Sequence, residues 1–179
     1  MKETGIVRRV DTLGRVVIPK EIRNVLKIEF GSPIEIYTDK DSIVLKKYYP
    51  MREFGKSAEK VAETLSKFTG HEVLISDENV FVASYGKLAK KYRSKEISDP
   101  IKNLIKENKT LSACFSDGRE TLPITKDEKA YFNQLFLPIR TDGKAIGMII
   151  LLEEEKEERI SEEDLRFAAI CAEFIAASV

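Results

Sequence analysis

The chain has 179 residues, is 42% hydrophobic and carries 30 basic and 30 acidic side chains, so its formal net charge is zero. This length and composition allow one large or two small globular domains. Zero net charge by itself argues against a strongly polyanionic partner, and the longest apolar run, 145–152, is too short to span a bilayer. The amino terminus lacks the apolar core of a signal peptide, so we expect a cytoplasmic protein without membrane association.

The charge is distributed unevenly along the chain. Residues 1–27 hold seven cations and three anions, a net +4, whereas residues 153–164 hold eight anions and two cations, a net −6. This asymmetry indicates that the two ends serve different purposes. The two cysteines, Cys114 and Cys171, stand far apart, match no metal-ligand spacing and are expected to be reduced packing residues.

The first 48 residues predict two strands, a short helix and two further strands. Pro19 follows a β-branched run and suits the first turn of a helix, where its missing N–H costs nothing. Gly14 provides the permissive backbone of a tight turn between the first two strands. The predicted strands are 4–10, 16–18, 34–37 and 43–45, with a polar turn at 39–42, and the predicted helix is 20–26.

Regularly placed cations mark this segment as the candidate functional site. The helix has an apolar face at Ile22, Val25 and Leu26, which leaves Arg23 and Asn24 on its wetter side. The first predicted strand carries two arginines, and a third stands at the edge of the turn. Guanidinium groups on a rigid scaffold can bind phosphate oxygens and guanine edges. The alternative is that they are ordinary solvated surface. The candidate DNA-binding residues are Arg8, Arg9, Arg15, Arg23 and Asn24.

A unit of about 48 residues with four short strands is not expected to be stable alone, because it buries too little surface and leaves strand edges open. Interleaving with a second copy would close those edges. A two-fold homodimer would also double every cation on the presented face.

The stretch MKETGIVRRVDTLGRVVIPKEIR, residues 1–23, resembles almost residue for residue the DNA-binding domain of the AbrB transition-state regulators. The resemblance implies an interwoven dimeric swapped-hairpin β-barrel over residues 1–50 that binds double-stranded DNA. It also implies DNA contacts for the arginines that match Arg8, Arg15 and Arg23. Relatives usually carry a basic residue at the position of Arg9 and an arginine at that of Asn24, so the asparagine is a departure.

Residues 51–70 predict an amphipathic helix that ends at Gly70. Its apolar residues recur at alternating steps of three and four, which is a narrow seam suited to packing against another helix. Two interpretations stay open: association across a subunit boundary or against the carboxy-terminal helix, and packing of the helix on its own domain. The seam consists of Met51, Phe54, Ala58, Val61, Leu65 and Phe68.

Residues 71–179 predict one α+β domain. Strands are expected at 72–75, 80–84, 111–115, 133–140 and 144–152, with a hairpin turn at 141–143. Ser161 to Asp164 has the spacing of a capping box that begins a final helix. The order of elements resembles the GAF small-molecule sensor fold with flanking helices. Its pairing with an AbrB-like domain resembles a family of tetrameric sporulation transcription factors, which implies a homotetramer; whether a small-molecule effector binds is left open.

No catalytic or cofactor site is predicted. His71 is the single histidine, and a lone histidine is more often a surface or packing residue than a base. The chain also lacks a phosphate-binding glycine loop, so we expect no enzyme, no metal and no cofactor. Residues 87–109 hold eight cations against three acids, which indicates a solvated helix and loop or a second anion-binding surface. Tyr85 and Tyr92 are candidates to line a pocket there, or else belong to the core or surface.

Three functions remain in view. The leading one is a transcription regulator of sporulation-stage gene expression that acts in the cytoplasm at the nucleoid. The second is a toxin-neutralising antitoxin, because swapped-hairpin barrels also occur in that class, although a flexible tail rather than 130 patterned residues follows them there. The third is a ligand-binding scaffold.

Overall fold

The computed structural model describes residues 4–87, 89–114, 118, 120–126, 131–155 and 158–179. It divides the chain into two compact units, 1–48 and 49–179, a division two residues before the boundary predicted after residue 50. Of the segments singled out from the sequence, residues 1–3, 88, 115 and 156–157 lie outside the described ranges. No helix of the described part is long and apolar enough to cross a membrane.

The first unit contains one short helix and one hairpin. Helix α1 (Lys20–Leu26) follows Pro19, as predicted. Strands β1 (Ile34–Asp39) and β2 (Ser42–Lys47) pair antiparallel, with Asp39 opposite Ser42 across a two-residue turn. Lys40 in that turn has a positive φ of 49°, as tight hairpin turns require.

The two strands predicted at 4–10 and 16–18 are absent from the described chain, which corrects that prediction. The turn between them does form, because the Asp11 N–H donates to the Arg15 carbonyl oxygen at 3.0 Å. Beyond this turn the two arms form no ladder with each other or with the β1–β2 hairpin. Strand propensity is local, whereas a strand exists only where a second segment accepts and donates its backbone hydrogen bonds.

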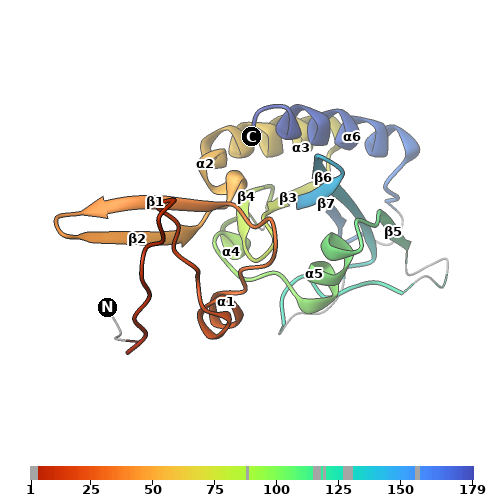
Figure 1. The fold of residues 1–179 in the computed structure, drawn as a ribbon. Coiled ribbons are helices and arrows are strands. Elements are labelled where there is room, and N and C mark those ends of the chain that lie inside the picture. The colour runs from red at the N-terminus through yellow and green to blue at the C-terminus, as the bar shows by residue number, and fades with distance from the viewer. Residues whose placement is uncertain (1–3, 88, 115–117, 119, 127–130, 156–157) are drawn as a thin grey trace. The chain divides into compact units, whose positions relative to one another are not determined.

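The second unit is a five-stranded antiparallel sheet covered by helices on both faces (Figure 1). The strand order is β4-β3-β7-β6-β5. Its strands are β3 (Glu72–Ser76), β4 (Phe81–Tyr85), β5 (Leu111–Cys114), β6 (Asn133–Thr141) and β7 (Lys144–Glu153). Its helices are α2 (Pro50–Glu53), α3 (Gly55–Thr69), α4 (Ala89–Tyr92), α5 (Asp99–Lys106) and α6 (Glu162–Ala176). The overall class is α+β, as predicted.

Alternate residues of the central strands face two separate cores. Val73 and Ile75 of β3 belong to the core under α3 and α6, whereas Leu74 between them belongs to the core under α5. Eight residues of β6 and nine residues of β7 are at least half-buried. Strands buried on both faces give continuous apolar runs rather than alternation. The β6–β7 turn uses positive φ at Asp142 and Gly143, as the predicted hairpin requires.

The predicted helix 51–70 is interrupted at Phe54, which separates α2 from α3, and ends at Gly70 in the left-handed conformation. Its seam packs on its own domain: Met51, Ala58 and Leu65 are buried in the core shared with the sheet and α6. The exception is Phe68, whose side chain is 71% exposed. Within the chain the seam therefore packs both on the sheet of its own domain and against the carboxy-terminal helix α6, so the two interpretations hold together.

The lysine-rich segment is less solvated than predicted. Helix α5 places Ile101 and Ile105 against the sheet, and Ile97 before it is fully buried. Tyr92 is also fully buried and shares a hydrogen bond with the hydroxyl of Tyr131. The cations stay outside because an amphipathic helix sorts its faces by polarity.

His71 lies buried between two carboxylates from elements distant in sequence. Its Nδ1 is 3.0 Å from Glu153 Oε2 at the end of β7, and its Nε2 is 3.3 Å from Asp164 Oδ2 in the first turn of α6. Asp164 is also the N3 residue of the predicted capping box, which is confirmed. Ionised carboxylates only accept hydrogen bonds, so a ring nitrogen that carries hydrogen donates to the carboxylate that it faces. The ring thus connects α3, the sheet and α6.

We expect His71→Gln to lower the free energy of unfolding by about 1–3 kcal/mol at neutral pH, because it removes a hydrogen-bonding partner from two largely buried carboxylates. Burial alone would raise the pKa of Glu153, but hydrogen bonds from the backbone of Glu155 and from His71 hold it below its ordinary value. A lowered carboxyl pKa stabilises the fold above the ordinary value of 4.5, and this stabilisation is lost as pH falls through the folded-state pKa.

Urea titrations across a pH series measure both effects. The difference between wild type and His71→Gln should narrow below about pH 4.5. Lys67→Gln, which removes an exposed ion pair on the preceding helix α3, is the control and should cost less than about 1 kcal/mol. Equal stability of His71→Gln and wild type at neutral pH would show that the cluster contributes nothing.

Candidate nucleic-acid interface

Asp11 organises the turn that carries the predicted site. Its Oδ1 accepts hydrogen bonds from the backbone N–H groups of Leu13 at 2.9 Å and Arg15 at 2.8 Å. The Gly14 N–H donates to the Asp11 carbonyl oxygen at 3.0 Å, and Gly14 has a φ of 77°, which favours glycine. An aspartate that bonds its own following backbone is a common way to stabilise a turn.

The same carboxylate orients Arg15. Asp11 Oδ2 lies 2.8 Å from Arg15 Nε, and the two side chains are 41% and 71% exposed. Hydrogen bonds from the Arg15 backbone and side chain lower the pKa of Asp11. The pair uses Nε, and since the side chain is largely exposed, Nη1 and Nη2 remain available to a ligand. Our sequence reasoning missed this contact, although the Asp–Arg spacing of four residues across a glycine turn could have indicated it.

The other two arginines before the turn are also exposed. Arg8 Nη1 donates to the adjacent Val7 carbonyl oxygen at 3.1 Å, a local contact that leaves most of its donors available. Arg9 is exposed, and no acidic partner is found for either residue among the described residues. These arginines lie on the arm 4–10, whose backbone has no ladder within the chain.

Arg23 and Asn24 lie on α1, whose backbone is well defined at its end. The Ile28 N–H donates to the Arg23 carbonyl oxygen at 2.8 Å, and the Lys27 N–H donates to that of Asn24 at 3.3 Å. Lys27 adopts the left-handed conformation with φ 51°, so the helix ends in a Schellman motif. Both side chains are exposed, as the helical spacing predicted.

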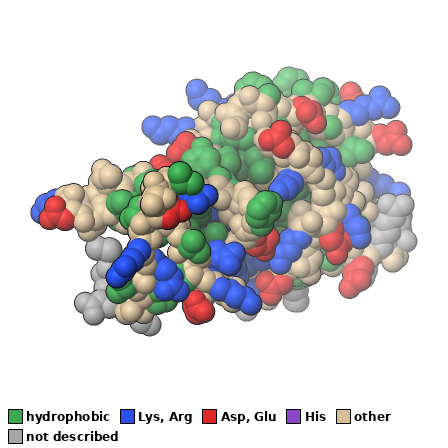
Figure 2. All heavy atoms as spheres, viewed as in Figure 1, with side chains coloured by type: hydrophobic (Ala, Val, Ile, Leu, Met, Phe, Trp, Pro, Cys, Tyr) green, Lys and Arg blue, Asp and Glu red, His purple; other side chains and the backbone are tan. Residues whose placement is uncertain are grey.

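The structure therefore presents all five predicted site residues to solvent, on three short elements of one unit. It does not join them by direct contacts, and within the described residues Arg15 is the one of the four arginines that makes an ion pair. Figure 2 shows Lys and Arg side chains gathered around the amino-terminal segment. Exposed guanidinium groups on a scaffold of this kind can bind phosphates and base edges.

The first unit has almost no core of its own. Pro19 is the one residue of its described part that is buried, and α1 buries none. Large apolar side chains are exposed throughout, for example Val17 at 74% and Val25 at 81%. The exposed set is Ile6, Val7, Val10, Leu13, Val16, Val17, Val25, Leu26, Phe30, Ile36, Tyr37, Ile43 and Leu45. So many exposed large apolar side chains on one small unit indicate an interaction site.

The rest of the described chain offers no competing chemical site. Cys114 on β5 and Cys171 on α6 are free, and burial raises the pKa of the Cys171 thiol, which disfavours the reactive thiolate. No group of three candidate metal ligands is found among the described residues. His71 is occupied by its two carboxylates.

Two family models match separate parts of the chain. The family model "Stage V sporulation protein T C-terminal, transcription factor" matches residues 53–179, and "Antidote-toxin recognition MazE, bacterial antitoxin" matches residues 7–52. The second unit also resembles the GAF domain of an Acinetobacter phosphoenolpyruvate-protein phosphotransferase, with a TM-score of 0.57, 13% identity and coverage of 69% of this chain and 80% of that one. This likeness shows the fold alone.

Two curated relatives cover the amino-terminal unit. The transition state regulatory protein AbrB of Bacillus subtilis is 46% identical over 78 residues, which are 44% of this chain and 80% of AbrB. Stage V sporulation protein T of Bacillus subtilis is 37% identical over 177 residues, which are 98% of this chain and 97% of that protein. The chain therefore belongs to the Stage V sporulation protein T family and is a DNA-binding regulator of sporulation transcription with an AbrB-like amino-terminal domain.

Proposed function

We propose that two copies of the first unit intertwine into one AbrB-like swapped-hairpin barrel, which presents Arg8, Arg9, Arg15, Arg23 and Asn24 of each copy to duplex DNA. The observation that carries the proposal is the combination of an almost coreless unit with exposed arginines. A regulator of this kind acts in the cytoplasm, where the nucleoid lies.

The second copy is the partner that fits this surface best. The arms 4–10 and 15–19 lack ladder partners, and an identical chain supplies identical arms through a two-fold axis. Burying a large apolar side chain stabilises by about 1.5–3 kcal/mol, so covering Val17, Val25 and their neighbours can supply the stability that one unit lacks. The similarity of this unit to AbrB supports the same assembly.

The arginines then act as one cationic surface. Guanidinium groups pair with phosphate oxygens in a bidentate manner and read guanine in the major groove. Asp11 holds Arg15 by Nε, so Nη1 and Nη2 of that guanidinium remain available to a phosphate or a base. Asn24 supplies a neutral amide at a position where an arginine would add charge, and an amide can pair with adenine.

We expect Arg23→Ala to weaken DNA binding by about 1–3 kcal/mol and to change sequence preference if Arg23 contacts a base; a pure phosphate contact would weaken all sequences alike. Arg8→Ala and Arg15→Ala should each lower affinity too. Fluorescence anisotropy on labelled promoter fragments at several salt concentrations measures this, with a wild-type slope of log K against log[salt] near about −5. Lys106→Ala, at an exposed position of α5, is the control. Equal binding by wild type and the arginine variants would favour a scaffold function.

We expect Val17→Asp to abolish dimerisation of a fragment comprising the first unit, because the dimer would have to bury a charge among apolar side chains. Lys40→Asp adds the same side chain at the hairpin turn and should leave the dimer intact. Sedimentation equilibrium measures the mass. A Val17→Asp fragment that remains a folded dimer would rule out this interface.

The outer face of α6 carries exposed apolar side chains. Phe167, Ile170 and Phe174 follow one another at helical spacing, and Ile170 and Phe174 are 66% and 58% exposed. Phe68 of the neighbouring helix α3 stacks on Phe167, with ring centroids 5.9 Å apart. We infer that a second copy of this face covers it and joins two dimers into a tetramer, since each helix pair offers the same apolar stripe to its symmetry mate.

We expect Ile170→Glu to convert the full-length tetramer into dimers without loss of folding, because Ile170 is already largely solvent-exposed within one chain. Lys106→Glu serves as the control on α5. Light scattering measures the mass, and circular dichroism checks the fold. An unchanged tetramer in Ile170→Glu would place the contact elsewhere.

The antitoxin function is supported by the MazE family match to residues 7–52. Against it stands the ordered α+β unit at 49–179, where a toxin-wrapping tail would be extended. The transcription function therefore remains the proposal.

A further inference from the structure

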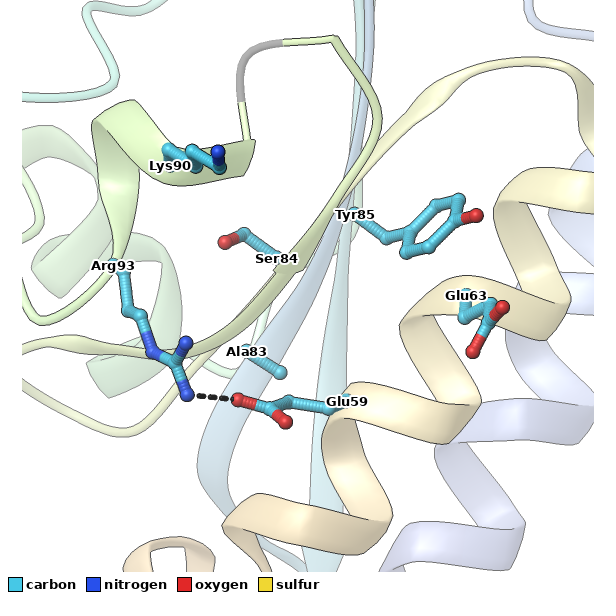
Figure 3. Close-up of a pocket in the computed structure, with 7 residues that line it drawn as sticks. All are labelled: Glu59, Glu63, Ala83, Ser84, Tyr85, Lys90 and Arg93. Atoms are coloured by element: carbon cyan, nitrogen blue, oxygen red, sulfur yellow. Dashed lines mark hydrogen bonds and ion pairs between the residues drawn. The ribbon is translucent and has the colours of Figure 1, made fainter.

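A groove opens at the free edge of the sheet in the second unit, between α3, β4 and α4 (Figure 3). Its volume is about 280 Å³. Helix α3 contributes Glu59 and Glu63, strand β4 contributes Ser84 and Tyr85, and the α4 segment contributes Lys90 and Arg93.

The groove separates charges of opposite sign on opposing walls. Glu59 and Glu63 are four residues apart on α3 and so share one helix face, and Lys90 and Arg93 are three residues apart on the other wall. A ligand with only negative charge would meet the two carboxylates, and a ligand with only positive charge would meet the two cations. The arrangement is complementary to a molecule that carries one charge of each sign.

The charged side chains of the groove form ion pairs within the protein, and a ligand can replace these pairs. An ion pair joins Arg93 to Glu59 across the groove, as the dashed line in Figure 3 shows, and its side chains are 70% and 45% exposed. Glu63 pairs with Lys67 at 2.7 Å on the outer surface of α3, also in an exposed position. Exposed ion pairs contribute little to stability, so a ligand can displace them at small cost.

The volume limits the ligand to a small metabolite, since pockets for drug-sized molecules begin near about 300 Å³. The groove also differs from the space between the sheet and helix α5, which is filled by buried side chains that include Tyr92, Ile101 and Phe136. Tyr85, one of the two tyrosines considered as pocket residues from the sequence, lines the groove, whereas Tyr92 does not.

We propose that this groove is an effector site for a free α-amino acid or an equally small zwitterion. Lys90 and Arg93 bind its carboxylate, Glu63 and Glu59 bind its ammonium group, and Tyr85 packs against its side chain. The proposal rests on the groove alone and does not depend on the DNA interface.

The test is isothermal titration calorimetry of the full-length protein with each standard free L-amino acid at up to about 10 mM, where even a weak complex is detected. For the amino acid that binds, the N-acetyl derivative removes the ammonium charge and the amide derivative removes the carboxylate. Each derivative should bind about tenfold more weakly or worse, since one charge-assisted contact is lost.

Matched variants locate the site. Arg93→Gln should weaken the amino acid about tenfold but leave the amide derivative unchanged, and Glu63→Gln should weaken the amino acid but leave the N-acetyl derivative unchanged. Lys106→Gln, outside the groove, is the control and should bind as wild type. Because the chain has no tryptophan, Tyr85→Trp adds a single fluorescent reporter whose emission should change on binding.

Two results would overturn the proposal. One is the absence of heat and of Tyr85→Trp response with every amino acid tested. The other is binding that Arg93→Gln and Glu63→Gln both leave unchanged, which would place the ligand elsewhere. Neither result bears on DNA affinity, so failure here leaves the regulator function untouched.

Discussion

The first unit must acquire its core from outside itself, and the other properties of the protein depend on this constraint. With Pro19 as the one buried residue of its described part and apolar side chains exposed along both arms, the unit gains little hydrophobic stabilisation as a single chain. The positions of its arginines are therefore fixed only when another surface covers the apolar side chains of the unit. Assembly and DNA recognition are in this view one event, because the same contacts that close the apolar surface fix the positions of the guanidinium groups.

The second unit has the opposite character. Its sheet is covered on both faces, its central strands are buried, and His71 ties the start of β3 to the end of β7 and the beginning of α6. The second unit is stable within one chain, whereas the first unit is not. This difference suggests that the second unit associates copies of the chain and so raises the local concentration of the first unit. Joining two binding modules raises overall affinity without any new contact to DNA.

Local electrostatics explain how a neutral chain can bind a polyanion. The net +4 of residues 1–27 is concentrated on exposed elements, and the compensating acids lie mainly in 153–164. Asp11 is an acid within the basic segment, yet it orders the turn through its Oδ1 and directs Arg15 through its Oδ2. This carboxylate therefore offsets one positive charge of the segment, and it also holds Arg15 in a defined orientation. In the second unit, the groove beside β4 balances its charges across two walls, which suits a small zwitterion rather than nucleic acid.

Features set by neighbouring residues could be predicted from the sequence. These are the helix that begins after Pro19, the end of α3 at Gly70, the 141–143 hairpin turn, the capping box from Ser161 to Asp164, and the five candidate DNA-binding residues as exposed positions. Propensity, periodicity and capping act over a few residues, so they can be read from the order of amino acids. The resemblance of residues 1–23 to AbrB gave the function that those local rules alone would have left open.

Contacts between distant residues were decided only by the tertiary structure. Periodicity identified the seam from Met51 to Phe68 but could not tell whether its partner was the chain's own sheet or another subunit. The arms 4–10 and 16–18 have strand propensity and no ladder, because pairing depends on a second segment that local sequence does not specify. His71 was expected to be a surface or packing residue rather than a base, and it joins carboxylates 82 and 93 residues away. Which residues meet across such separations is set by the packing of whole elements, since the energy that brings them together comes from the core and not from the residues themselves.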